Sequence, residues 1–268
     1  MDKPTVAILC RVNAGLRLYE QALTEAGVKY HLIGRSGYWA AQEVRSVLSY
    51  LGGCVFPADY VVSGMLSAPF WPTKFLPKTK LRSRLKELAE AEGKTYWKLL
   101  TEDPRGLVDD KNLPALTEFT HFVHQLVRYR DLPAPDALKQ VLVALKAVEY
   151  YSEEEASPDN DPVGNLSLLV KIASKFRTIK EFLDYARKVT AASKSKTGVA
   201  LATCHAAKGL EFDSVYLVQC SEGILPHAKS TDLESERNCF FVGCSRAERK
   251  LTITYSGVPS AFLKKETK

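Results

Sequence analysis

Polar residues that could bind phosphate groups gather in the stretch from Val199 to Ser256. Thr203, His205 and Lys208 lie on a loop that directly follows an apolar run of the sequence. A hydroxyl, an imidazole and free backbone N–H groups at the end of a strand suit phosphate oxygens. The loop is therefore a candidate anion-binding segment, although a lone histidine in another setting is more often structural.

Two arginines could supply a second kind of chemistry. Arg11 ends an apolar run near the start of the chain, and Arg246 lies on a predicted helix just before the last apolar run. A planar guanidinium offers several N–H donors in a fixed fork, which suits the charge that develops on a transferred phosphoryl group. We expect both side chains to project from one edge of a sheet. The alternative is a pair of solvated or carboxylate-paired surface arginines.

The elements that must position these residues are short apolar runs without strict alternation. Such runs predict strands that are buried on both faces of a parallel sheet. Helical spacing after each of the first two runs predicts a right-handed strand–helix–strand crossover. The expected strands are 5–10, 30–33, 199–203, 215–220 and 251–255, and the first two helices are 16–26 and 40–51.

Between residues 56 and 194 the sequence shows helical periodicity almost throughout. The clearest helices are expected at 81–91, 113–127, 137–148, 163–176 and 179–190. The predicted fold class is therefore α/β, with a parallel-sheet domain formed by both ends of the chain (1–55 and 195–268). An all-helical domain, residues 56–194, interrupts it.

Two further segments could contact nucleic acid. Tyr38 and Trp39 follow Gly34 and Gly37, and aromatic faces can stack on bases without reading their sequence, although such pairs are more often part of a core. The segment from Pro69 to Lys86 carries basic residues interleaved with aromatics and contains no acid. It is either a backbone-binding face or the solvated start of a helix. Its basic residues are Lys74, Lys78, Lys80, Arg82, Arg84 and Lys86.

Composition places mild limits on function. With 268 residues and 46% hydrophobic content the chain can bury a core, and its formal charge of +6 agrees with a polyanionic partner without requiring one. The six cysteines form no C-x-x-C pair, and no apolar run reaches the roughly 20 residues of a membrane helix. We expect a cytoplasmic protein with no membrane association. His121 and His124 lack a third ligand, so no metal site is expected.

Three segments, in the same order along the chain, resemble motifs IV, V and VI of the superfamily 1 DNA helicases of the UvrD/Rep/PcrA type. The first is Ala7-Ile-Leu-Cys-Arg-Val-Asn-Ala14, together with the helix and the 28–34 segment that follow it. The second is Ala202-Thr-Cys-His-Ala-Ala-Lys-Gly-Leu-Glu-Phe212, and the third is Glu234-Ser-Glu-Arg-Asn-Cys-Phe-Phe-Val-Gly-Cys-Ser-Arg-Ala247. The resemblance implies a second RecA-like motor domain, interrupted by the helical insertion usually called 2B.

The resemblance also implies roles for single residues. Arg11 and Arg246 match arginines that reach the γ-phosphate of ATP in the manner of arginine fingers. Glu211 matches a residue near the ATP ribose, and Thr203 and His205 match residues that face single-stranded DNA. Lys208, in the same loop, and the Tyr38–Trp39 pair would add to the DNA contacts.

Together these features predict the C-terminal motor half of an ATP-dependent DNA helicase that acts on single-stranded or forked DNA. The resemblance alone implies that the motor moves 3′ to 5′. A phosphate-cradling loop with Lys and Ser/Thr is missing, since Gly93-Lys94-Thr95 has Leu88 where the first glycine should stand. ATP and Mg²⁺ would then be held mainly by an N-terminal RecA-like half, covalent or in trans. The isolated chain is expected not to hydrolyse ATP. The alternative is a stand-alone module that binds single-stranded nucleic acid or a partner and has no ATPase activity.

Overall fold

The computed structural model of the protein describes residues 5–34, 37–56, 58–102, 104, 106–153, 161–192 and 197–263. The chain forms two compact units. The first, here called the sheet unit, comprises Met1–Tyr38, Ser157–Asp161 and Lys188–Lys268. The second, the helical unit, comprises Trp39–Ala156 and Pro162–Arg187. The prediction of an α/β protein with a parallel sheet built from both chain ends is confirmed.

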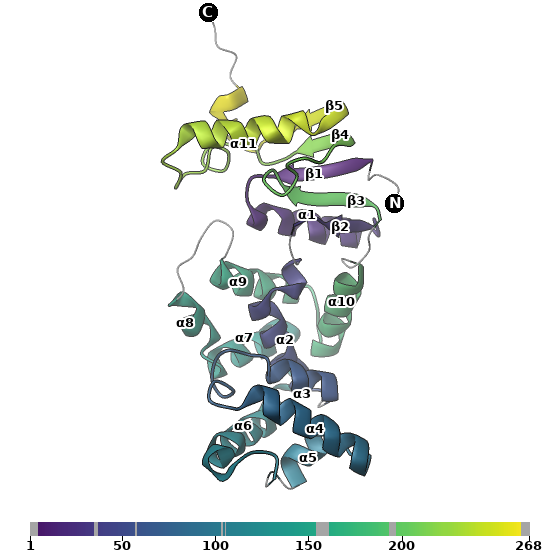
Figure 1. The fold of residues 1–268 in the computed structure, drawn as a ribbon, viewed down its shortest axis with the longest axis vertical. Coiled ribbons are helices and arrows are strands. Elements are labelled where there is room, and N and C mark those ends of the chain that lie inside the picture. Colours follow the sequence, from purple (N-terminus) through teal and green to yellow (C-terminus); the bar gives the residue numbers. More distant parts are fainter. Residues whose placement is uncertain are drawn as a thin grey trace, which may run out of the picture. The chain divides into compact units, whose positions relative to one another are not determined.

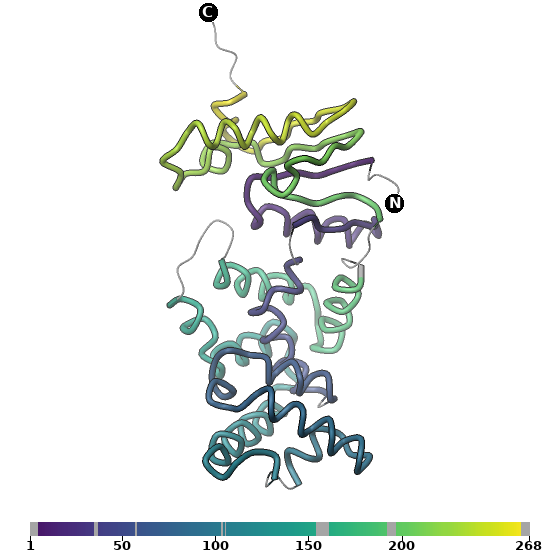
Figure 2. Tube along the Cα trace, in the orientation of Figure 1, coloured from purple at the N-terminus to yellow at the C-terminus, as the bar shows by residue number. Residues whose placement is uncertain are grey.

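Five parallel strands form the sheet of the sheet unit, in the order β2-β3-β1-β4-β5 (Figure 1). The strands are β1 Val6–Cys10, β2 Tyr30–Leu32, β3 Val199–Thr203, β4 Phe212–Leu217 and β5 Ala247–Ile253. β1 therefore lies at the centre, and Figure 2 shows this purple strand between two green strands from the other end of the chain. Ile8 of β1 is in register with Leu201 of β3 on one side and Tyr216 of β4 on the other.

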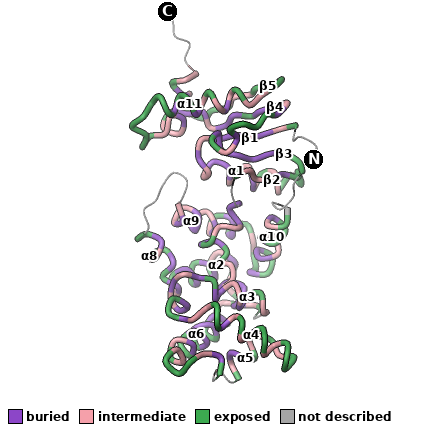
Figure 3. Tube along the Cα trace, viewed as in Figure 1, coloured by how far each residue is buried: buried purple, intermediate pink, exposed green. Residues whose placement is uncertain are grey.

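Helices α1 (Asn13–Glu25) and α11 (Leu233–Ser245) cover opposite faces of this sheet. Successive residues of a strand point to opposite faces, so Leu9 packs in a cluster with Cys239 of α11, whereas Cys10 packs with Leu16 of α1. Figure 3 shows β1 and β3 as mostly buried segments. Burial on both faces explains why these two strands read as continuous apolar runs.

The last two strands begin earlier than their apolar runs suggest. The Phe212 N–H donates to the Arg246 carbonyl at 2.9 Å, and this bond brings the start of β4 beside the start of β5. β5 is the edge strand, and its first half, with Glu248, Arg249 and Lys250, is exposed. Charged side chains are typical of an edge strand, where they discourage pairing with another chain. The expectation that every strand is buried on both faces is therefore wrong for β5.

The helical unit is organised around α2, whose buried face packs against α3, α7 and α9. Because of these contacts α2 belongs to the helical unit, and the units divide at 38/39 and 187/188, not at the expected 55/56 and 194/195. None of the described helices is long and apolar enough to cross a membrane. The helices are α2 Gln42–Gly53, α3 Asp59–Met65, α4 Lys78–Glu92, α5 Tyr96–Glu102, α6 Leu113–Leu126, α7 Ala134–Ala144, α8 Ala147–Ser152, α9 Pro162–Ala173 and α10 Ile179–Ala192, the last of which continues into the sheet unit.

The single helix expected over 137–148 is two helices in the structure. α7 ends at Ala144 and α8 begins at Ala147. Between them Lys146 has a φ of 51°, in the left-handed region, which does not continue a right-handed helix. Apolar periodicity persists across this break, and for that reason the sequence alone suggests one helix.

Gly198, at the start of β3, should be sensitive to substitution. Its φ is +100°, and a Cβ added there would lie 2.1 Å from the Lys29 carbonyl oxygen, which accepts the Val199 N–H at 2.9 Å. Gly198→Ala should lower the free energy of unfolding by more than the ~1–2 kcal/mol of left-handed strain, because the link between β2 and β3 must also shift. Gly27→Ala, at φ +67° with open space around it, should cost only the strain. Urea unfolding of both variants measures this, and equal losses would contradict the steric argument.

Candidate functional site

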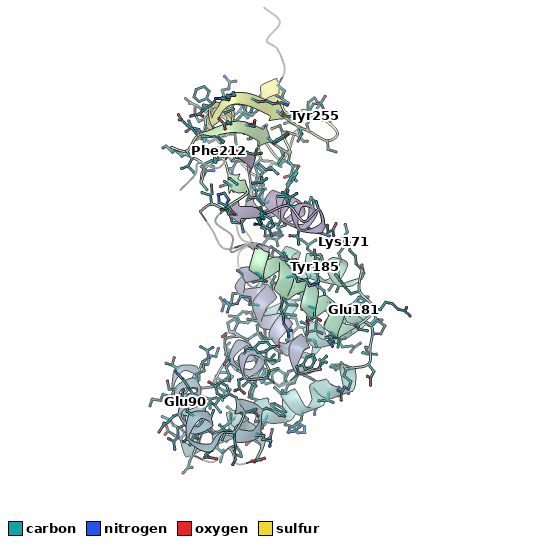
Figure 4. The ribbon with its side chains drawn as sticks, turned by 90° about the vertical axis from the view of Figure 1, so that its right-hand side faces the viewer. Glu90, Lys171, Glu181, Tyr185, Phe212 and Tyr255 are labelled. Atoms are coloured by element: carbon teal, nitrogen blue, oxygen red, sulfur yellow. The ribbon has the colours of Figure 1, made fainter. Side chains whose placement is uncertain are left out.

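Glu211 and Arg246 lie together where β4 and β5 begin. Arg246 caps the carboxyl end of α11, and its guanidinium donates from Nη1 to the Leu210 carbonyl at 2.9 Å and from Nε to the Val242 carbonyl at 3.1 Å. The Arg246 carbonyl accepts the N–H of Phe212, which Figure 4 labels, at 2.9 Å. Both neighbours of Glu211 are thus bonded to Arg246. The Glu211 side chain itself is exposed.

The Arg246 guanidinium keeps capacity for a further partner. Its Nη2 donates to the Ser245 hydroxyl at 2.9 Å, so its contacts within the described part of the chain use three of its five N–H groups. No carboxylate lies within ion-pair distance of it among the described residues. A half-exposed guanidinium with two available donors and no neutralising acid can receive an anion.

Arg11 is in a different situation, because it is paired with a buried acid. Its Nε lies 3.1 and 3.0 Å from the two carboxylate oxygens of Glu236, and its Nη2 donates to Oε1 at 2.7 Å. The Arg11 and Glu236 side chains are 16% and 2% exposed. The His227 N–H also donates to Glu236, at 3.0 Å. Burial by itself would raise the pKa of Glu236, but the Arg11 guanidinium and the His227 N–H outweigh it and hold that pKa below its usual value.

The prediction that Arg11 and Arg246 share one edge of the sheet is wrong. Arg11 follows β1, whereas Arg246 precedes β5, and the strands of this sheet run parallel. Arg11 therefore lies at the carboxyl edge and Arg246 at the amino edge. A crossover helix returns the chain to the amino edge of a parallel sheet, so a residue at the end of that helix lies opposite a residue at the end of a strand.

The loop after β3 places its polar residues at the carboxyl edge, as expected. The Thr203 side chain is buried, and its hydroxyl accepts the Ala206 N–H at 3.2 Å, while the Thr203 carbonyl accepts the Ala207 N–H at 3.0 Å. These bonds fold the loop into a tight turn. His205 and Lys208 are exposed on it. Thr203 thus stabilises the turn, whereas the side chains of His205 and Lys208 are accessible to a ligand.

Tyr38 and Trp39 do not present open ring faces. Each is only 3% exposed, and the two belong to different units. The Trp39 ring packs edge-on against Tyr185 of α10, labelled in Figure 4, and against Phe182, at centroid distances of 5.7 and 6.4 Å. The Arg17 guanidinium lies 6.0 Å from the centre of the Tyr38 ring. Of the two interpretations left open by the sequence, the structure favours packing over base stacking.

The basic segment of the helical unit is only partly available to a ligand. Lys74 and Lys80 are exposed, but the Lys78 ammonium donates to the Ala68 carbonyl and the Arg82 guanidinium donates to a serine hydroxyl at 2.6 Å. Burial, together with the nearby charge of Arg82, lowers the pKa of Lys78. Lys74 and Lys80 therefore remain the better candidates for contacts with a nucleic-acid backbone.

Glu236 is not among the functional residues predicted from the sequence, although the sequence contains a weak signal for it. Glu234 and Glu236 both lie in the first turn of α11, where acids are common. Only Glu236 is three and four residues before Cys239 and Phe240, which face the core. Helical phase therefore marks Glu236 as an acid on the buried face, where it needs a partner.

The buried pair should make stability depend on pH in a defined direction. At pH 7 Glu236→Gln should lower the free energy of unfolding, because breaking a buried pair costs about 3–5 kcal/mol. Since the folded pKa of Glu236 is lowered, its stabilisation is complete above the usual glutamate pKa and is lost as the pH falls through the folded value. The difference between wild type and variant should therefore shrink in acid.

Urea unfolding at pH 7 and at several acidic pH values tests this expectation. Glu234→Gln, on the exposed side of the same helical turn, is the matched control and should stay within about 0.5 kcal/mol of wild type. A Glu236→Gln loss that is the same at every pH would contradict the ionic interpretation.

Comparison with known proteins agrees with this architecture. A profile of the UvrD-like helicase C-terminal domain matches residues 117–257. The ATP-dependent DNA helicase PcrA of Bacillus subtilis is 26% identical over 277 residues, which cover 96% of this chain and 37% of PcrA. DNA helicase II of Escherichia coli is 28% identical over 272 residues, covering 93% of this chain and 37% of that relative. The srs2 helicase of Schizosaccharomyces pombe is 28% identical over 276 residues, covering 93% and 31%.

The chain spans about a third of the length of these relatives. The matched segment, residues 117–257, makes up more than half of the chain. The chain belongs to the UvrD-like helicase C-terminal domain family.

Proposed function

We propose that the chain is the C-terminal motor half of an ATP-dependent DNA helicase that translocates 3′ to 5′ along single-stranded or forked DNA. In this proposal an N-terminal RecA-like half, covalent or in trans, holds most of the ATP and its Mg²⁺. The observation that carries the proposal is the division of polar residues between two edges of one sheet. Arg246 and Glu211 lie at the amino edge, Thr203 and His205 lie at the carboxyl edge, and Lys208 lies on the segment that joins the two edges.

Arg246 is the residue that we assign as the arginine finger. It has two available N–H donors and no carboxylate partner in the described part of the chain, which suits the charge on a γ-phosphate. Glu211 beside it can accept a hydrogen bond from a ribose hydroxyl. Arg11 would have to leave a buried acid before it could reach a phosphate, so we assign it to structure.

The link between the two edges would be residues 204–211. This segment leaves β3 at the carboxyl edge and enters β4 at the amino edge, since the two strands run parallel. It carries His205 near its start, Lys208 in its middle and Glu211 at its end. A change in the position of Glu211 when ATP binds would thereby move the groups that contact DNA.

Arg246→Ala should abolish the contribution of this chain to ATP hydrolysis. In a reconstituted motor containing an N-terminal RecA-like half and single-stranded DNA, kcat should fall by about 10³–10⁵, the usual contribution of an arginine finger. Arg249→Ala, at an exposed position of β5 with Asp213 3.7 Å away, is the matched control and should leave kcat near wild type. Steady-state phosphate release measures both. Unchanged turnover in Arg246→Ala would favour the stand-alone binding module instead.

Lys208→Ala should weaken binding of single-stranded DNA through the loss of one phosphate contact. Fluorescence anisotropy with a labelled oligonucleotide at several salt concentrations should show the slope of log K against log salt reduced by about 0.7. Lys229→Ala, an exposed lysine elsewhere in the sheet unit, should leave the slope unchanged. A wild-type affinity that does not vary with salt would exclude a DNA-backbone interface on this chain.

A further inference from the structure

Thiols are concentrated on one side of the sheet. Five of the six cysteines belong to the sheet unit, and all six are reduced in the structure. Cys204, Cys220 and Cys239 lie in the single apolar cluster between the sheet and α11, and Cys244 packs against that cluster. The nucleotide and DNA chemistry proposed above uses none of these sulfur atoms.

Two of these thiols are in contact. Cys204 is the first residue after β3, and Cys239 lies on α11. The hydrogen bond that Cys204 makes with Cys239, together with burial, raises the pKa of the Cys204 thiol. Gly243, one turn after Cys239, permits this approach, since a Cβ at Gly243 would lie only 3.0 Å from the Cys204 sulfur. The loop after β3 and α11 are therefore in contact through the side chains of Cys204 and Cys239.

The thiols of Cys239 and Cys204 differ in their surroundings. The His205 Nδ1 lies 3.9 Å from the Cys239 sulfur, and the His205 imidazole is exposed. Cys239 is 5% exposed, whereas Cys204 is fully buried. Cys239 therefore has a proton acceptor and some access to solvent, and a thiolate at its sulfur could accept a hydrogen bond from the Cys204 thiol. Cys204 is placed to react second.

We propose that Cys239 and Cys204 are a thiol pair that hydrogen peroxide converts reversibly into a disulfide. The His205 imidazole takes the Cys239 proton, and the thiolate attacks one peroxide oxygen, so that the O–O bond breaks. The products are a sulfenic acid on Cys239 and a hydroxide, which takes the proton from the imidazolium and leaves as water. The Cys204 sulfur then attacks the sulfenic sulfur, the S–S bond forms, and the S–O bond breaks. The leaving hydroxyl group takes the proton of the Cys204 thiol and departs as a second water.

The disulfide would join the 204–209 loop covalently to α11. That loop carries His205 and Lys208, and Arg246 is the residue that follows the end of α11. Oxidation would therefore restrict the loop that offers these side chains to a ligand. Formation of the bond does not depend on the proposed helicase function, because it requires only the fold of the sheet unit.

The test uses the full chain, first reduced and freed of reductant. The protein is treated with one equivalent of hydrogen peroxide at neutral pH, remaining thiols are alkylated, and the chain is digested without reduction for mass spectrometry. We expect a cross-linked pair of peptides containing Cys204 and Cys239 that disappears on treatment with dithiothreitol. Circular dichroism before digestion establishes that the protein stayed folded.

Three variants identify the roles. Cys204→Ala should leave Cys239 as a sulfenic acid that dimedone traps, and Cys239→Ala should prevent both products. His205→Asn should slow oxidation of Cys239 several-fold. Cys54→Ala, in the helical unit, is the control and should form the disulfide at the wild-type rate. A folded wild-type chain that forms no Cys204–Cys239 bond, forms other pairs equally, or forms this bond only in urea would overturn the proposal.

Discussion

The pairing of β1 with strands from the far end of the chain is the constraint on which the rest of the structure depends. β1 is flanked by β3 and β4, so the sheet can close only when residues 199–217 return to residues 6–10. This closure requires the long helical insertion to leave from and return to the same unit. It also determines which polar residues become neighbours, because each strand end carries its own loop to a defined edge.

The two edges of the sheet carry different polar groups, and two of the segments that run between the edges begin or end at these groups. One is the 204–211 connection, and the other is α11, whose first turn is held at the carboxyl edge by the Arg11–Glu236 pair. The far end of α11 is Arg246, at the amino edge. A helix is a stiff element, so a displacement at one edge would be carried to the other. This geometry agrees with the proposed function, in which the state of the nucleotide is related to contact with DNA.

Close packing between the 204–209 loop and α11 is a further consequence of this arrangement. Gly243 has no side chain, and a Cβ there would approach Cys204 and Leu217 to 3.0 and 2.8 Å. The loop can therefore lie against the helix, where its first residue meets the Cys239 thiol. This contact between the loop and α11 also brings the sulfur atoms of Cys204 and Cys239 together, as the proposed disulfide requires.

The sequence by itself determined the architecture and the identity of most polar loops. Buried strands read as continuous apolar runs, and helices as repeats of about 3.6 residues, because both patterns depend on local geometry. For that reason the central strands, the insertion and the 203–208 loop could be predicted. The predicted start of the edge strand β5, residue 251, lies after its observed start at Ala247, because the charged first half of the strand carries no apolar signal.

Only the tertiary structure decided which distant groups meet. Tyr38 and Trp39 could have been ligands or core. Both are buried, and Trp39 packs against Phe182 and Tyr185, which lie far along the chain. Arg11 and Arg246 are the same residue type, yet one is paired with a buried acid and the other keeps available donors. Periodicity in the sequence indicates whether a residue faces a core. It does not indicate which side chain the residue contacts there, because that contact depends on the order and direction of the strands in the sheet.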